Sequence, residues 1–228
     1  MAERWENLQV EGSNMKAFLC TPDGKGPFPS MLVIMGAPGV DASIQDTTRR
    51  LAAAGYASIA PDLYHRDNNH DPKEAFTDRV ARLTDMGIIR DVDAAVEFLR
   101  TRQLSSNYIG ITGFCLGGRV SFLMPGVHPD LFKATVPFYA ASLWTTYGEG
   151  PTTFTLLSNI KCPVLGFFGE EDHNPTTEDM HKIDSELTKN DVPHEFHCFA
   201  GAGHGFMAFP NPKMYREHAA QAAWPLLL

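Results

Sequence analysis

The sequence has few cysteines, no long apolar run and no cluster of basic residues. Its 228 residues include only 4 cysteines, and none forms a C-x-x-C pair, which argues against a disulfide scaffold or a zinc ribbon. We therefore expect free thiols. No stretch approaches the roughly 20 apolar residues that a membrane-spanning helix needs, and the amino terminus has no apolar signal segment. These absences predict a cytoplasmic protein with no membrane partner.

The charge balance is acidic. The chain has 19 Lys and Arg against 27 Asp and Glu, a formal charge of −8, so nucleic acid is not an expected partner. We find neither a dinucleotide fingerprint nor a phosphate-binding loop, and His194 and His197 would point to opposite faces of a strand. We therefore predict no cofactor and no metal. The length is compatible with one domain over residues 1–228, because α/β domains reach about 250 residues.

Short apolar runs alternate along the chain with segments of helical spacing. Val92, Ala95, Val96 and Leu99 form one apolar stripe, and Met180, Ile183 and Leu187 form another, as amphipathic helices do. Alternation of strands and helices predicts an α/β fold, a mostly parallel sheet with helices on both faces. The predicted core strands cover residues 31–35, 56–60, 108–112, 134–139, 164–168 and 195–199.

Local signals add detail at the edges of these elements. Residues 8–10 and 15–20 flank a turn and predict an antiparallel hairpin at the edge of the sheet. Asp41 is a candidate cap for the first helix, and Asn174 followed by Pro175 is the candidate start of the helix that contains Ile183. The polar stretch 62–71, including His65, Asp67, His70 and Asp71, is expected to be a solvated surface loop or a lid.

One motif indicates chemistry. Gly113-Phe-Cys115-Leu-Gly117 follows an apolar strand and precedes a helical stretch, the pattern of a nucleophile elbow with Cys in place of Ser. The glycines allow the sharp strand-to-helix turn, and the helix amino terminus favours a thiolate. In isolation the pattern is equally compatible with a buried cysteine at a glycine-rich turn.

A nucleophile of this kind needs a base, and the base needs a group that orients it. Asp172 follows the strand at 164–168, and His204 follows the strand at 195–199 between glycines. The order Cys115, Asp172, His204 is that of the α/β-hydrolase fold. For an oxyanion hole we expect the N–H of Leu116 and, from the loop after the first core strand, the N–H of Ala37, because Pro38 has none.

Taken together, the motifs of this sequence resemble those of the dienelactone hydrolase family. The resemblance runs from about Met15 to Ala223 and rests on Gly113-Phe-Cys-Leu-Gly-Gly118, Ala60-Pro-Asp-Leu-Tyr64, Gly169-Glu-Glu-Asp-His173 and Gly203-His-Gly-Phe206. It implies a cofactor-free α/β-hydrolase that acts on esters or lactones, as a monomer or small homo-oligomer. It also implies Cys115 as nucleophile, His204 as base and Asp172 as the residue that orients it.

Two positions depart from the family branch that acts on dienelactone. A Glu that contacts the thiol in that branch is replaced by Gly36, so either His204 deprotonates Cys115 directly, which we prefer, or another carboxylate such as Asp41 substitutes. An Arg that helps to hold the substrate carboxylate is also absent, because the segment around Ala208 is apolar. Arg79 and Arg82 are alternative sources of that charge, or else solvated helix residues.

The leading hypothesis is a cysteine hydrolase of small esters or lactones that works through a covalent acyl-enzyme. Peptidase activity is disfavoured, because a thiolate is also a good leaving group and its adduct with an amide tends to collapse backwards. The alternatives are a non-catalytic or redox-regulated member that binds a small ligand, and an acyl transferase on the same scaffold.

Overall fold

The computed structural model describes residues 1–67 and 73–228. They form two compact units, which we describe separately: Met1–Ile109 with Thr146–Gly150, and Gly110–Thr145 with Pro151–Leu228. Strand β5 (Ser105–Phe114) begins in the first unit and ends in the second. Within the described residues, no helix combines the length and apolar character that a membrane span requires. The expectation of one domain stays a prediction.

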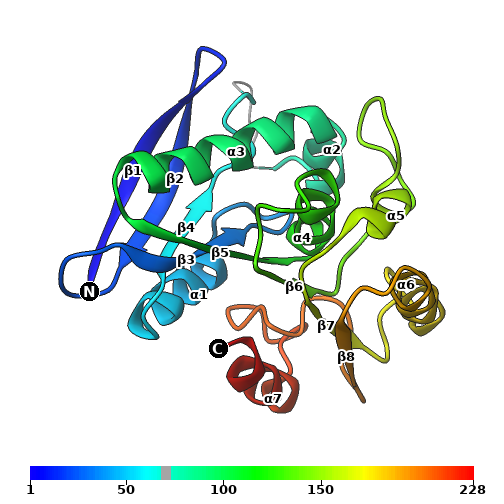
Figure 1. Cartoon of the computed structure of the whole chain (residues 1–228). Coiled ribbons are helices and arrows are strands. Elements are labelled where there is room, and N and C mark those ends of the chain that lie inside the picture. Colours follow the sequence, from blue (N-terminus) through cyan, green and yellow to red (C-terminus); the bar gives the residue numbers. More distant parts are fainter. Residues whose placement is uncertain (68–72) are drawn as a thin grey trace. The chain divides into compact units, whose positions relative to one another are not determined.

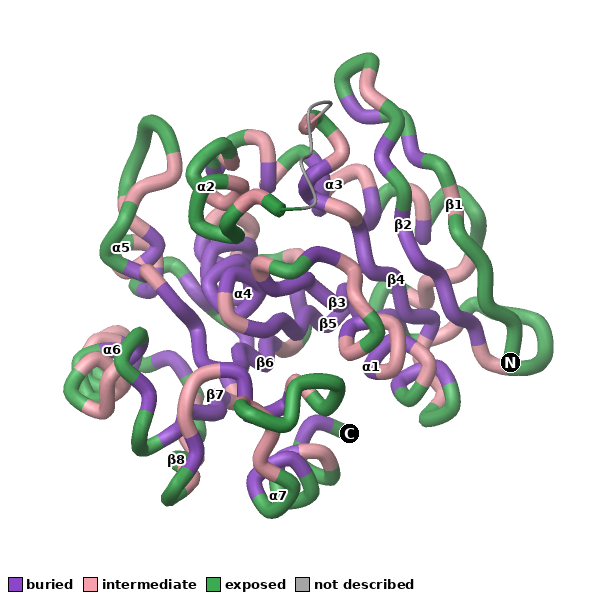
Figure 2. The backbone as a smooth tube through the Cα atoms, turned by 180° about the vertical axis from the view of Figure 1, so that it is seen from behind, coloured by how far each residue is buried: buried purple, intermediate pink, exposed green. Residues whose placement is uncertain are grey.

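The first unit contains four paired strands (Figure 1), in the order β1 (Ala2–Val10), β2 (Ser13–Thr21), β4 (Ala57–Pro61) and β3 (Phe28–Ile34). β1 and β2 form an antiparallel hairpin, β2 is antiparallel to β4, and β3 is parallel to β4. Most of β1 is exposed, whereas every residue of β4 is buried (Figure 2). This unbroken burial explains why β4 reads as a continuous apolar run.

Two long helices of the first unit pack against these strands. α1 (Ala42–Ala53) and α3 (Asp85–Thr101) both contact β3 and β4. Asp41 caps α1, because its carboxylate accepts the N–H groups of Ser43 and Ile44, which have no partner within the helix. The predicted stripe of α3 is buried at Val92, Ala95, Val96 and Leu99. Along the chain, the short helix α2 (Phe76–Val80) comes between α1 and α3, and none of its residues is buried.

The second unit positions the candidate site. β5, β6 (Ala134–Phe138), β7 (Val164–Gly169) and β8 (His194–Phe199) pair in this order, all parallel. The carboxyl ends of parallel strands lie at one edge of the sheet, so the segments that follow them gather there. The helices of this unit are α4 (Leu116–Val127), α5 (Thr153–Leu156), α6 (Thr177–Lys189) and α7 (Glu217–Leu227), with a 3₁₀ turn at Leu157–Asn159.

This arrangement confirms the predicted fold class, a mostly parallel α/β-hydrolase fold with an antiparallel hairpin at its amino-terminal end. Each predicted core strand is present, with ends that differ by a few residues. β1 is longer than predicted, because its first residues are exposed and mix apolar with charged side chains without the alternation of a half-buried strand. The predicted strand at 134–139 ends at Phe138, because Tyr139 has a φ of 35°.

The predicted start of α6 was wrong. Its cap is Thr176, whose hydroxyl accepts the N–H of Asp179 while the Asp179 carboxylate accepts the N–H of Thr176. This reciprocal capping box satisfies two donors at once and therefore outcompetes an isolated Asn. Asn174 and Pro175 precede the helix.

The expectation of a solvated loop at 62–71 was wrong for His65. Its side chain is 2% exposed and bonds to Ser13 and Asp91. Asp67 is also mostly buried and pairs with Arg82. Sequence could not show this, because Ser13 and Asp91 are distant along the chain. His70 and Asp71 lie outside the described residues.

Candidate functional site

The candidate site begins at Cys115, between β5 and α4. Cys115 has φ 59° and ψ −112°, a conformation that costs about 1–3 kcal/mol for a residue with a side chain. Its N–H donates to the carbonyl of Phe138, and its own carbonyl accepts the N–H groups of Arg119 and Ala141 at 3.1 and 3.3 Å. The neighbours therefore hold the turn in a strained form, as the elbow motif predicts.

Gly113 explains why the elbow needs glycine. A Cβ at this position would lie 2.2 Å from the carbonyl oxygen of Gly117, far inside van der Waals contact. The first helical turn of α4 can follow the strand this closely only when position 113 adds no side-chain atoms. Cys115 consequently lies at the start of α4, where the helix N–H groups have no partner within the helix.

The next strand ends place an acid and a histidine together. Asp172, in the turn after β7, has a side chain that is only 1% exposed, and its Oδ2 lies 2.9 Å from Nδ1 of His204. Its Oδ1 accepts the N–H of Asn174 at 2.9 Å. Since a carboxylate oxygen can only accept, Nδ1 of His204 carries the proton and the bond orients the ring.

His204 links the acid to the thiol. Burial alone lowers its pKa, but hydrogen bonds to Asp172 and Cys115, together with their negative charges, outweigh burial and raise the pKa from 6.5 to about 10. The ring is thus favoured as an imidazolium at neutral pH. Cys115, Asp172 and His204, predicted from sequence, are therefore brought together in one unit, and this arrangement can stabilise a thiolate and move a proton.

The other three cysteines are free thiols, as expected, and differ from Cys115 in their surroundings. Burial raises the pKa of Cys20 and of Cys162 to about 11. Cys198 lies in β8 but is exposed, and partial burial and Glu170 raise its pKa as well. A raised pKa disfavours the thiolate, so none of the three is favoured as a nucleophile.

The two predicted oxyanion donors belong to different units. Leu116 is the first residue of α4 and follows Cys115 directly. Ala37 lies in the first unit, in a tight turn closed by the bond from the Gly39 N–H to the Gly36 carbonyl, and its carbonyl accepts the hydroxyl of Tyr64. Both roles stay predictions. Asp41, the alternative thiol base, is already engaged as the cap of α1.

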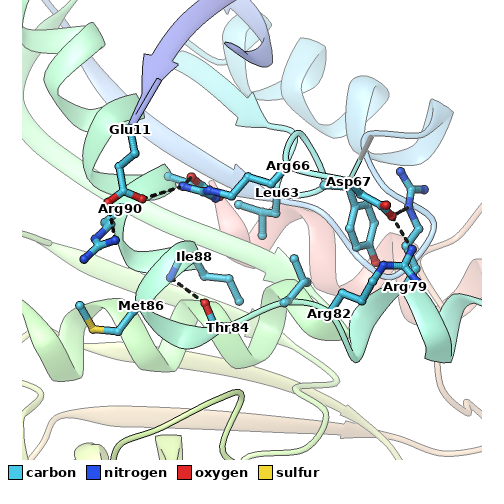
Figure 3. A pocket seen from close by; sticks show the side chains of 14 residues that line it. Glu11, Leu63, Arg66, Asp67, Arg79, Arg82, Thr84, Met86, Ile88 and Arg90 are labelled. Carbon is cyan, nitrogen blue, oxygen red and sulfur yellow. Dashed lines mark hydrogen bonds and ion pairs between the residues drawn. The ribbon is translucent and has the colours of Figure 1, made fainter. Parts of the chain in front are cut away.

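A cavity of about 250 Å³ in the first unit is lined by arginines and carboxylates (Figure 3). Arg82 pairs with Asp67 and Glu74, so its charge is already balanced. The guanidinium of Arg79 lies 3.9 Å from the ring centre of Tyr64, and its side chain is 16% exposed. The alternative of a solvated helix residue is therefore wrong for Arg79. That either arginine holds a substrate carboxylate stays a prediction.

Two residues near His204 were missed by sequence reasoning. The ring of Tyr139 meets the His204 ring edge-on, with 5.1 Å between centroids. Asn174 bonds to Ser142 in the loop after β6. No sequence pattern indicates these contacts. Tyr139 was predicted as the end of a strand, and Asn174 was predicted as a helix cap. Phe206, two residues after His204, is fully buried in the core.

A strained cysteine between a parallel strand and a helix, followed by an acid and a histidine at later strand ends, defines the class of α/β-hydrolases with cysteine at the elbow. The model of the dienelactone hydrolase family matches residues 15–228. The chain belongs to the dienelactone hydrolase family.

Individual relatives have names that are consistent with this family. The chain is similar to a Synechocystis protein named "Putative carboxymethylenebutenolidase", with 32% identity over 230 residues that cover 96% of this chain and 89% of the relative. An Escherichia coli K12 protein of the same name is 30% identical over 231 residues, covering 97% and 83%. The crystal structure of a Klebsiella pneumoniae protein named "Putative Dienelactone Hydrolase" has a TM-score of 0.89 and 28% identity, covering 100% and 98%.

Proposed function

We propose that this protein hydrolyses small esters or lactones through a covalent acyl-enzyme on Cys115. The observation that carries the proposal is the 2.9 Å bond between His204 and Asp172, together with the influence of Cys115 on the pKa of His204. Asp172 orients the ring, and His204 moves the proton. The relatives named carboxymethylenebutenolidase support a lactone as substrate.

Acylation starts when His204 takes the proton of the Cys115 thiol, a transfer that the raised pKa of His204 favours. The thiolate of Cys115 attacks the carbonyl carbon, a C–S bond forms and the carbonyl electrons move onto oxygen. The N–H of Leu116 stabilises this oxyanion, and Ala37 stays the candidate that the sequence offers for a second donor. When it collapses, the C–O bond breaks and His204 gives its proton to the leaving oxygen.

Deacylation reverses the direction of the proton. The now neutral His204 accepts a proton from water, and the resulting hydroxide attacks the thioester carbonyl. The second tetrahedral adduct collapses with release of the acid and of the Cys115 thiolate, which restores the ion pair. Because a thiolate leaves readily, activated esters, enol lactones and thioesters suit the site better than amides.

The test is hydrolysis of an activated aryl ester and of an enol lactone by wild type and Cys115→Ala. Cys198→Ala is the matched control, because it removes an exposed thiol of the same unit. We expect turnover by wild type and Cys198→Ala and its loss in Cys115→Ala. Equal rates in wild type and Cys115→Ala would overturn the proposal and favour a ligand-binding member of the family.

A further inference from the structure

The proposed chemistry leaves the side chain of Asn174 without a role, although it lies two residues after Asp172. The side chain reaches across to Ser142, in the loop that follows β6. Its Oδ1 accepts the N–H of Ser142 at 3.0 Å, and its Nδ2 donates to the Ser142 hydroxyl at 3.4 Å. One amide thus holds one residue at two points.

The loop on the far side of this clamp is attached to the nucleophile turn. Ala141 donates its N–H to the carbonyl of Cys115 at 3.3 Å, and the next N–H along the chain, that of Ser142, goes to Asn174. Two successive backbone donors therefore connect the turn that carries the thiol with the turn that carries the acid.

On its near side, Asn174 acts directly on the acid. Its backbone N–H donates to Oδ1 of Asp172 at 2.9 Å, while Oδ2 of the same carboxylate bonds to His204 at 2.9 Å. The plane of the carboxylate is thus defined by one bond to the ring and one to the backbone of Asn174.

Ser142 needs external support to stay in place. Its φ is 58°, a left-handed conformation that is unfavourable for a residue with a Cβ. The fully buried Arg119 donates to its carbonyl at 3.3 Å and to that of Thr145 at 2.9 Å. Arg119 holds the carbonyl side of Ser142, and Asn174 holds the N–H side.

We infer that Asn174 is a positioning residue, whose clamp on Ser142 holds the carboxylate of Asp172 toward His204 and so keeps the imidazole in line with Cys115. The contacts run without a break from the carbonyl of Cys115 through Ala141 and Ser142 to Asn174, and from Asn174 through Asp172 to His204. Asn174 is the side-chain link in that series of contacts that takes no part in the chemistry. Its effect on rate rests on the proposed function, whereas its effect on the titration of His204 does not.

The test compares Asn174→Ala, Asn174→Asp and a control, Asn159→Ala. Asn159 is another exposed Asn of the same unit whose side chain donates to a backbone carbonyl, that of Gly126, at 3.1 Å. Each variant is measured for kcat and KM on an activated aryl ester, for the midpoint of the His204 titration by NMR, and for Tm. The resonance of His204 is assigned with His204→Gln.

In Asn174→Ala we expect kcat to fall about five- to tenfold with KM within about twofold, and His204 to titrate about half a pH unit lower or more. Asn174→Asp keeps an acceptor for the Ser142 N–H and adds a negative charge near the imidazolium. It should keep kcat within about threefold and titrate at the wild-type pH or higher. Asn159→Ala should lower Tm similarly without changing kcat or the titration.

A wild-type kcat and titration in Asn174→Ala, or changes no different from those of Asn159→Ala, would overturn the inference. If wild type turns over no ester at all, the proposed function fails, and the NMR titration still decides the role of Asn174. The two failures are therefore distinguishable.

Discussion

Each unit contains a His–Asp pair with a buried carboxylate and the same N···O distance of 2.9 Å. In the second unit His204 bonds to Asp172, and the His204 side chain is 29% exposed. In the first unit His65 bonds to Asp91 and is 2% exposed, with its second nitrogen 2.9 Å from the hydroxyl of Ser13. By its contacts alone, the first pair is also a Ser–His–Asp constellation.

The two His–Asp pairs differ in the groups that surround them. Asp91 also pairs with Arg66 at 2.8 Å, so its charge is balanced within the first unit, and the cluster ties the hairpin turn to α3. Asp172 instead has a backbone N–H and one imidazole as partners. His204 also lies close enough to Cys115, on its strained turn, for the cysteine to raise the pKa of the ring. The two pairs therefore differ in the group that balances the carboxylate and in the group beside the histidine.

Removal of Cys115 or of Ser13 should give the largest difference in turnover between the two units. Cys115→Ala should lower the hydrolysis of an activated ester by about 10³-fold or more, because the covalent step is lost. Ser13→Ala should leave turnover within twofold. Steady-state rates at saturating substrate measure both. A loss of activity in Ser13→Ala would show that the first unit's constellation also takes part.

The two acids give the next largest contrast. Asp172→Asn should lower kcat by about 10²-fold or more, since the orienting charge beside His204 is lost. Asp91→Asn leaves Arg66 without its buried partner and should reduce the free energy of unfolding by about 1–3 kcal/mol, with kcat near wild type. Denaturation in urea and steady-state kinetics on both variants separate these effects. Equal losses of kcat would contradict the assignment.

Two glycines compare the tightness of the elbow with that of the hairpin turn. Gly113→Ala places a Cβ 2.2 Å from the Gly117 carbonyl oxygen and should destabilise the protein by about 3 kcal/mol or more. Gly12→Ala meets nothing within 4 Å but has a φ of 81°, so we expect about 1–2 kcal/mol. Urea denaturation ranks them, and a smaller effect at Gly113 would show that the elbow relaxes.

The variants His204→Gln and Asn159→Ala also test a predicted pH dependence of stability. Folding raises the pKa of His204 from 6.5 to about 10, so its contribution to stability is full below pH 6.5 and is lost as the pH rises through about 10. The difference in unfolding free energy between wild type and His204→Gln should shrink over that range. The difference for Asn159→Ala should stay constant. A difference for His204→Gln that grows with pH would contradict the raised pKa.

Sequence was sufficient for much of the second unit. Its buried strands are short apolar runs, and Cys115, Asp172 and His204 each follow one of them, so chain order and parallel pairing bring them together. The cap at Asp41 was also predicted correctly, because a capping carboxylate acts on N–H groups two and three residues away.

What sequence missed depends on contacts between distant residues. Asn174 bonds to Ser142, 32 positions away, and His65 to Ser13, 52 positions away. No local pattern distinguishes a cap from a long-range clamp, or a solvated histidine from a buried one. The roles of Ala37 and Leu116 as donors and the oligomeric state stay predictions.

The most direct test of the central claim is intact-mass measurement during a single turnover of an activated aryl ester, followed by peptide mapping. We expect a transient acyl adduct on the peptide that contains Cys115. It should be present in wild type and in Ser13→Ala, and it should be absent in Cys115→Ala. An adduct on any other residue, or turnover of the ester with no adduct in wild type, would contradict the claim.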